Sequence, residues 1–225
     1  MAFARVKVMS ICEKEQGQVN EVEQRSSWLY QSFIGPTIHD ALFGLLLNKG
    51  RKAAIAALPR GEQVRVLEVG SGSGLSFRHY PPGMEVVAID PSERMLRRAA
   101  KRQRKAHADI SLVRARGEEL PFGREFDAVV LMHVLSVVED AQVLLEQAHQ
   151  VLRPGGQIIV VNASHKYNLL TKGLSRLLPQ SLVTQILGFH GNFDHEKILN
   201  NERWHLKENV RTGASRVLAL EKRAA

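Results

Sequence analysis

Alternating glycines directly after a run of branched aliphatic residues point to a strand that ends in a ligand-binding turn. Residues 64–69 (VRVLEV) have the composition of a buried parallel strand, and Gly70, Gly72 and Gly74 follow at once. Glycine tolerates the unusual dihedrals of a tight turn and lets backbone amides approach a ligand closely. We therefore expect this strand to lie inside a sheet, with the turn at the carboxyl edge.

Further strands and helices alternate along the chain. Strands are expected at residues 85–89, 110–113, 126–132 and 157–162. Helices are expected at residues 92–106 and 140–152, and a short crossover at residues 75–80 joins the first two strands. This order predicts a doubly wound α/β fold with a parallel sheet. Residues 203–211 and 214–221 predict a terminal antiparallel hairpin, which makes a seven-stranded sheet of five parallel strands plus the hairpin.

The composition excludes several other classes of protein. With 225 residues, of which 44% are hydrophobic and 24% charged, the chain matches a soluble globule large enough for one core. The single cysteine, Cys12, can form neither an internal disulfide nor a thiolate cluster, so we expect a cytoplasmic location and no metal. The apolar runs are shorter than the roughly 20 residues that cross a bilayer. The net charge of +8 favours anionic partners.

Two segments are expected to lie outside the sheet. Residues 1–60 have a polar start, followed by helices that would end near residues 48–50, and we expect them to form a helical N-terminal cap or lid. Residues 165–200 or so are expected to form an amphipathic helical insertion, because leucines recur there at helical spacing. The ligand-binding domain is expected to span residues 61–225.

The spacing of the glycines narrows the choice of ligand. Asp90, at the end of the second strand, can accept hydrogen bonds from a ribose diol in either a dinucleotide or an adenosylmethionine site. A dinucleotide fingerprint has Gly or Ala three residues after its second glycine, where this chain has Leu75. The turn has the spacing GxGxG instead. Together with residues 118–122 (EELPF) and 152–156 (LRPGG), these landmarks resemble a class I S-adenosylmethionine-dependent methyltransferase over residues 62–162.

The resemblance implies a Rossmann-like fold, S-adenosyl-L-methionine as the cofactor, and a set of binding residues. Asp90 would hold the ribose, and Pro91 and Met95 would border the adenine. Glu118 or the backbone would contact the adenine amine, because Arg116 stands where the family often has an acid. The implied cofactor-binding residues are Glu68, Gly70, Ser71, Gly72, Gly74, Asp90, Pro91, Met95, Gly117, Glu118, Met132 and His133.

Catalysis in such a family requires alignment of the reactants and no covalent intermediate. The sulfonium is already a competent methyl donor, so the protein must align a neutral nucleophile with the methyl group and exclude water. His133 is expected either to take or relay a proton or to pack against the cofactor. Tyr30 is expected either to close over the cofactor and touch a substrate amine or only to pack. Tyr30 and His133 are the candidate catalytic residues.

The residues after the fourth strand narrow the methyl acceptor. Amine-directed nucleic-acid methyltransferases place Asn or Asp, two prolines and an aromatic there, whereas this chain has LMHV at residues 131–134, so no specific nucleic-acid partner is expected. Cytosine C5 chemistry needs a cysteine nucleophile, and Cys12 lies far upstream. Residues 30–36 (YQSFIGP), 50–55 (GRKAAI) and 135–140 (LSVVED) instead resemble the small soluble bacterial phosphatidylethanolamine N-methyltransferases.

That second resemblance implies N-methylation of a phospholipid headgroup amine at the membrane surface. The expected partner is an anionic membrane or its phospholipid, with the protein attached peripherally. Lys166, Lys172 and Arg176, beside the leucines of the insertion, fit such a surface, with packing of those leucines on the sheet as the alternative. Seven further basic residues lie within 94–105, where a solvated helix face is the alternative. Gln31 and Ala163 depart from the family's usual Tyr-Asp and Asn-His pairs. A soluble small-molecule or quinone-type methyltransferase and a non-catalytic adenosylmethionine-binding regulatory module remain as alternatives.

Overall fold

The computed structural model describes residues 44, 47–61, 63–163, 202–213 and 215–223. The predictions for the rest of the N-terminal segment, including Tyr30, lie outside the described residues. The same holds for the leucine-rich insertion. These remain predictions.

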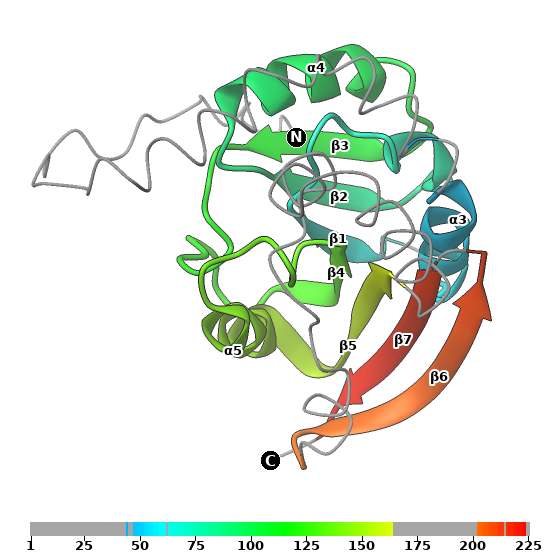
Figure 1. The fold of residues 1–225 in the computed structure, drawn as a ribbon, viewed down its shortest axis with the longest axis vertical. Helices are drawn as coiled ribbons and strands as arrows, with labels where there is room; N and C mark the ends of the chain where they lie inside the picture. The colour runs from blue at the N-terminus through cyan, green and yellow to red at the C-terminus, as the bar shows by residue number, and fades with distance from the viewer. Residues whose placement is uncertain (1–43, 45–46, 62, 164–201, 214, 224–225) are drawn as a thin grey trace, which may run out of the picture.

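Seven strands form one mixed sheet in the order β3-β2-β1-β4-β5-β7-β6 (Figure 1). The first five strands pair in parallel, and β7 pairs antiparallel with both β5 and β6. The predicted sheet of five parallel strands plus a terminal hairpin is therefore confirmed. The strands are β1 (Arg65–Val69), β2 (Glu85–Ile89), β3 (Asp109–Val113), β4 (Phe126–Met132), β5 (Leu152–Ala163), β6 (Trp204–Thr212) and β7 (Ser215–Lys222).

Helices cover both faces of the sheet, as expected of a doubly wound fold (Figure 1). On one face, α3 (Asn48–Ala56), the short 3-10 helix η1 (Phe77–His79) and α4 (Glu93–Gln103) contribute to one apolar core. On the other face, α5 (Ala141–Val151) contributes its leucines to a second core. Because every parallel strand ends at the same edge, the residues that follow β1, β2 and β4 and the last residues of β5 are brought together. In the described part of the chain, no helix combines the length and apolar character of a membrane span.

A helix was expected to end near residues 48–50, and the structure shows that α3 begins there, at Asn48, after a turn at Leu47. Gly50 suggested a helix end, but its role is close packing against β7. A Cβ atom at Gly50 would lie 2.4 Å from the Oγ atom of Ser215. The absence of a side chain thus lets α3 lie directly on the sheet, and the alanine-rich sequence after Gly50 continues the helix.

The end of α5 is fixed by a lysine from the last strand. The Nζ atom of Lys222 donates hydrogen bonds to the carbonyl oxygens of His149 (2.6 Å) and Leu152 (3.0 Å). The last carbonyls of a helix have no partner within the helix, and a cation there also interacts favourably with the helix dipole. Lys222 therefore joins the C-terminal strand to the end of α5.

Replacement of this lysine is expected to destabilise the fold. Lys222→Met keeps the aliphatic stem but leaves two carbonyls unsatisfied, so the free energy of unfolding should fall by roughly 1–3 kcal/mol. Urea unfolding followed by circular dichroism measures the loss. Lys207→Met is the matched control, because Lys207 forms a solvent-exposed ion pair with Glu221 and such pairs contribute about 1 kcal/mol or less. Equal stabilities of the two variants would contradict the assigned role of Lys222.

Candidate functional site

The three glycines after β1 have different surroundings. All three have positive φ angles, 71° at Gly70, 55° at Gly72 and 77° at Gly74. A Cβ atom at Gly70 would meet Val134, and one at Gly74 would meet the ring of Phe77. By contrast, no heavy atom lies within 4 Å of the Cβ position of Gly72. Two glycines thus allow close packing of the turn, and Gly72 faces open space where a ligand can approach the backbone.

Asp90, directly after β2, holds the glycine turn from the neighbouring strand. Asp90 is only 8% exposed, and its Oδ2 accepts from the backbone N–H of Gly72 and its Oδ1 from that of Ser92, both at 2.9 Å. Burial raises the pKa of Asp90, and these two hydrogen bonds oppose the rise. Each carboxylate oxygen can accept a further hydrogen bond, so the oriented group can bind a diol.

Glu68 is a buried acid at the same edge, within β1. It is 2% exposed and accepts hydrogen bonds from the hydroxyls of Ser76 (2.6 Å) and Tyr80 (2.9 Å). Burial raises its pKa to about 7, against the opposing effects of those hydrogen bonds and of the positive charge of Arg51. The group is therefore poised to ionise near neutral pH when a cation binds beside it.

Arg51 is a site residue that the sequence analysis missed. It lies on α3, is 8% exposed, and its Nη1 donates to the carbonyl oxygen of Gly44 at 3.3 Å. Its positive charge lowers the pKa of both Glu68 and His133, which places the guanidinium near both. A guanidinium binds carboxylates with two parallel hydrogen bonds, so Arg51 can hold the carboxylate of an amino-acid ligand. The sequence offers only one signal for Arg51, its place within the GRKAAI segment at residues 50–55.

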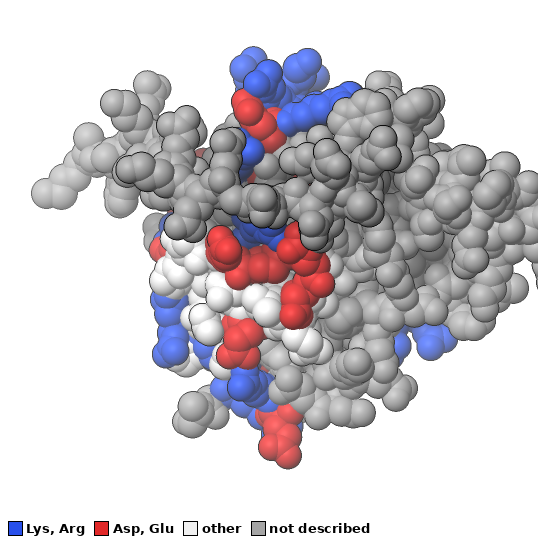
Figure 2. Space-filling view, turned by 60° about the vertical axis from the view of Figure 1, so that its left-hand side comes forward, with Lys and Arg blue, Asp and Glu red and all other residues white. Residues whose placement is uncertain are grey.

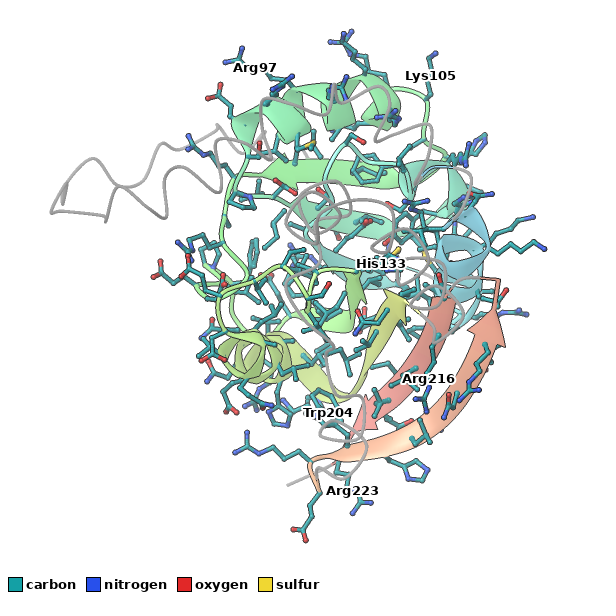
Figure 3. All side chains as sticks on the ribbon, in the orientation of Figure 1. Arg97, Lys105, His133, Trp204, Arg216 and Arg223 are labelled. Carbon is teal, nitrogen blue, oxygen red and sulfur yellow. The ribbon has the colours of Figure 1, made fainter. Side chains whose placement is uncertain are left out.

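His133 follows β4 in a strained backbone conformation, with φ at 59° (Figure 3). The residue is partly exposed, yet both ring nitrogens are buried and have no hydrogen-bond partner. Burial, with a smaller effect of Arg51, lowers the pKa of His133 to about 3. The imidazole is thus neutral at physiological pH and is a weak base. It can accept or donate a hydrogen bond to a ligand, but it will not hold a proton there.

The remaining site candidates lie around this edge in different ways. Pro91 is exposed, and Met95 is half-buried in the first turn of α4. Gly117 is buried where a Cβ would come within 2.9 Å of side-chain atoms of Val69 and Leu144, so only glycine fits there. The carboxylate of Glu118 accepts a hydrogen bond from the backbone N–H of Glu139. Met132 lies in the core beneath the edge, and the hydroxyl of Ser71 is buried without a partner.

Comparison with known proteins identifies the chain. The family model described as a methyltransferase domain matches residues 67–160. The phosphatidylethanolamine N-methyltransferase of Cereibacter sphaeroides is 33% identical over 180 residues, which cover 77% of this chain and 85% of that protein. The chain belongs to the class I S-adenosylmethionine-dependent methyltransferases. It is an enzyme whose cofactor is S-adenosyl-L-methionine.

Two further methyltransferases match this chain, one over a shorter alignment and one at lower sequence identity. The ubiquinone/menaquinone biosynthesis C-methyltransferase of Syntrophotalea carbinolica is 34% identical over 145 residues, which cover 63% of this chain and 61% of that protein. The solved structure of an S-adenosylmethionine-dependent methyltransferase from Thermotoga maritima superposes with a TM-score of 0.61 at 17% identity. That superposition covers 88% of this chain and all of the other, and it shows the shared fold.

The residues of this methyltransferase fit its cofactor. The open side of Gly72 leaves room for a ligand to reach the backbone, and the carboxylate of Asp90 has acceptor capacity left that ribose hydroxyls could use. Glu68 and Arg51 can hold the ammonium and carboxylate groups of the methionine moiety. The unpartnered hydroxyl of Ser71 is available for one more polar contact in the same turn.

Proposed function

We propose that this methyltransferase N-methylates the amine of a phospholipid headgroup, phosphatidylethanolamine, at a membrane surface. The observation that carries the proposal is the extent of the likeness to the Cereibacter enzyme. That alignment spans 180 residues, well beyond the matched methyltransferase domain at residues 67–160. It therefore includes segments outside the methyltransferase domain that the family model matches.

The charges at the carboxyl edge of the sheet favour a methyl acceptor that binds as an unprotonated amine. His133 is neutral, and Arg51 places a positive charge nearby, so a protonated amine is disfavoured at this position. S-adenosylmethionine supplies the electrophile: the amine lone pair forms the N–C bond while the C–S bond breaks and its electron pair stays on sulfur. The proton of the resulting ammonium leaves to water, since His133 is too weak a base to keep it.

Basic side chains on α4 support attachment to an anionic membrane. Arg97 and Lys101 are exposed on this helix, and Arg104 and Lys105 are exposed directly after it. Figure 2 shows blue atoms gathered at the top of the molecule. In Figure 3, Arg97 and Lys105 point away from the body of the protein. Each basic residue near an anionic lipid surface contributes about 1 kcal/mol to binding.

The test is methyl transfer from labelled S-adenosylmethionine to vesicles. We expect labelled phospholipid from vesicles of phosphatidylethanolamine with phosphatidylglycerol, together with sedimentation that high salt reverses. Vesicles of phosphatidylcholine with phosphatidylglycerol have no methyl acceptor and serve as the control for lipid binding alone. Absence of phospholipid methylation, with the cofactor bound, would contradict the proposal.

Quinone-ring C-methylation is the second candidate, favoured by the 34% identity to the Syntrophotalea enzyme. Its acceptor is a carbon of a dihydroxylated ring, whose hydroxyl must lose a proton to activate that carbon. The same assay with a demethylmenaquinol in detergent separates the two candidates. Labelled menaquinol without labelled phospholipid would establish the quinone reaction in place of the proposed one.

A further inference from the structure

Asn162, near the end of β5, is a buried polar residue without a structural role in the described part of the chain. Its side chain is 5% exposed, and neither the oxygen nor the nitrogen of the carboxamide has a hydrogen-bond partner. Buried polar groups in native proteins are hydrogen-bonded with few exceptions, and each exception requires an explanation. A ligand that supplies the missing partner is one such explanation.

The neighbouring strand does not satisfy Asn162. Arg216 of β7 lies opposite it in the antiparallel register and could have donated to the carboxamide oxygen. The Nε atom of Arg216 instead donates to Oδ1 of Asn209 on β6, at 3.0 Å. The residues before Asn162 in β5, Val160 and Val161, are buried and apolar. An apolar residue at position 162 would therefore suit the strand better than an asparagine.

The sheet register places Asn162 beside His133. Met132 pairs with Val161, and the backbone N–H of His133 donates to the carbonyl oxygen of Val161 at 2.7 Å. The next residue on each strand is His133 on one side and Asn162 on the other, and neighbouring strands lie about 4.8 Å apart. Two residues whose side chains have unused hydrogen-bonding capacity thus occupy adjacent positions at the ends of neighbouring strands.

This pair lies next to the cofactor turn. Val134, which follows His133, has its Cγ2 atom 2.7 Å from the position that a Cβ of Gly70 would occupy. The turn after β4 therefore packs directly against the first glycine of the turn after β1. A group bound between His133 and Asn162 would adjoin the glycine turn that is expected to bind the cofactor.

We infer that the Asn162 carboxamide, together with the His133 imidazole, binds the nucleophilic amine of the methyl acceptor. The inference rests on the proposed function. A free amine has N–H bonds on the side away from its lone pair, and the carboxamide oxygen and one imidazole nitrogen can each accept one of them. Two such hydrogen bonds direct the lone pair toward the methyl group without placing a charge beside it.

Asn162→Leu tests the inference, since leucine has a similar size but no hydrogen-bonding group. We expect its kcat with phosphatidylethanolamine vesicles to fall about 30-fold or more, with unchanged affinity for S-adenosylhomocysteine and a thermal midpoint equal to or above that of the unmodified protein. Asn162→Asp keeps an accepting oxygen and should retain more turnover than Asn162→Leu. Asn209→Leu, an exposed asparagine on β6, is the matched control and should retain full turnover.

The outcomes separate this inference from the proposed function. Phospholipid methylation by the unmodified protein with full turnover in Asn162→Leu would overturn the role of Asn162 and leave the proposed function standing. A lower thermal midpoint in Asn162→Leu, with cofactor binding and turnover lost together, would assign the residue a structural role instead. Failure of the unmodified protein to methylate phosphatidylethanolamine would overturn the proposed function and, with it, the amine assignment.

Discussion

The Asp90→Ala protein is expected to fold normally and to bind S-adenosylhomocysteine about 100-fold more weakly than the unmodified protein, or worse. The substitution removes both carboxylate oxygens available to the ribose hydroxyls. It also frees the backbone N–H of Gly72, which the carboxylate holds at 2.9 Å. The loss of charge-assisted hydrogen bonds and the loss of the fixed turn conformation both weaken binding of the ligand. Isothermal titration calorimetry measures the affinity, and circular dichroism with urea unfolding checks the fold.

Asp109→Ala is the control for this experiment. Asp109 is an exposed acid at the start of β3, at the opposite end of the sheet from the carboxyl edge. Its removal changes the net charge by the same amount, so any general electrostatic effect on the cofactor is matched. An affinity in Asp90→Ala equal to that of Asp109→Ala would refute the ribose-binding role of Asp90.

Cofactor affinity is expected to rise steeply with pH between about pH 5 and pH 7. The pKa of Glu68 is raised to about 7 in the folded protein, so below that pH the group is protonated before the ligand binds. The ammonium of the methionine moiety favours the ionised form, and binding must then release a proton. Affinity should increase by up to about tenfold per pH unit over this window. Titrations in buffers with different heats of ionisation count the released proton.

The raised pKa of Glu68 also predicts that the free energy of unfolding falls as pH rises. Because the folded pKa lies above the unfolded value of 4.5, the stabilising contribution of Glu68 is complete below pH 4.5 and is lost as pH rises through 7. Relative to Glu68→Gln, the ligand-free protein should lose about 3 kcal/mol of stability over that interval. Glu68→Gln should also show weak, pH-independent cofactor binding. A pH dependence that persists in Glu68→Gln would assign the proton to another group.

The parts of the fold that were predictable from sequence depend on local signals. Branched aliphatic runs such as residues 126–132 form buried strands because helices cover both faces of the sheet. The glycine turn and Asp90 could be recognised because a tight turn and a strand-ending acid leave fixed spacings. The Thr-Gly turn near the C-terminus likewise indicated the hairpin of β6 and β7.

The parts that were missed depend on contacts between distant segments. From the sequence alone, Gly50 suggests the end of a helix. The structure shows that it is a contact point between α3 and Ser215, which lies far along the chain. Arg51 joins the site only because α3 packs on one face of the sheet, close enough for the charge of Arg51 to lower the pKa of Glu68. The neutral state of His133 and the unpartnered carboxamide of Asn162 follow from burial and register, which no local pattern encodes.

Amide chemical shifts test the account most directly, because they locate the cofactor without relying on any substitution or any choice of acceptor. On addition of S-adenosylhomocysteine to the isotope-labelled protein, the backbone amides of Gly70, Gly72, Gly74 and Ser92 should shift most. The amides of β6, at the far edge of the sheet, should not move. Saturable shifts confined to β6 or α5, with the glycine turn unchanged, would place the cofactor elsewhere and contradict the account.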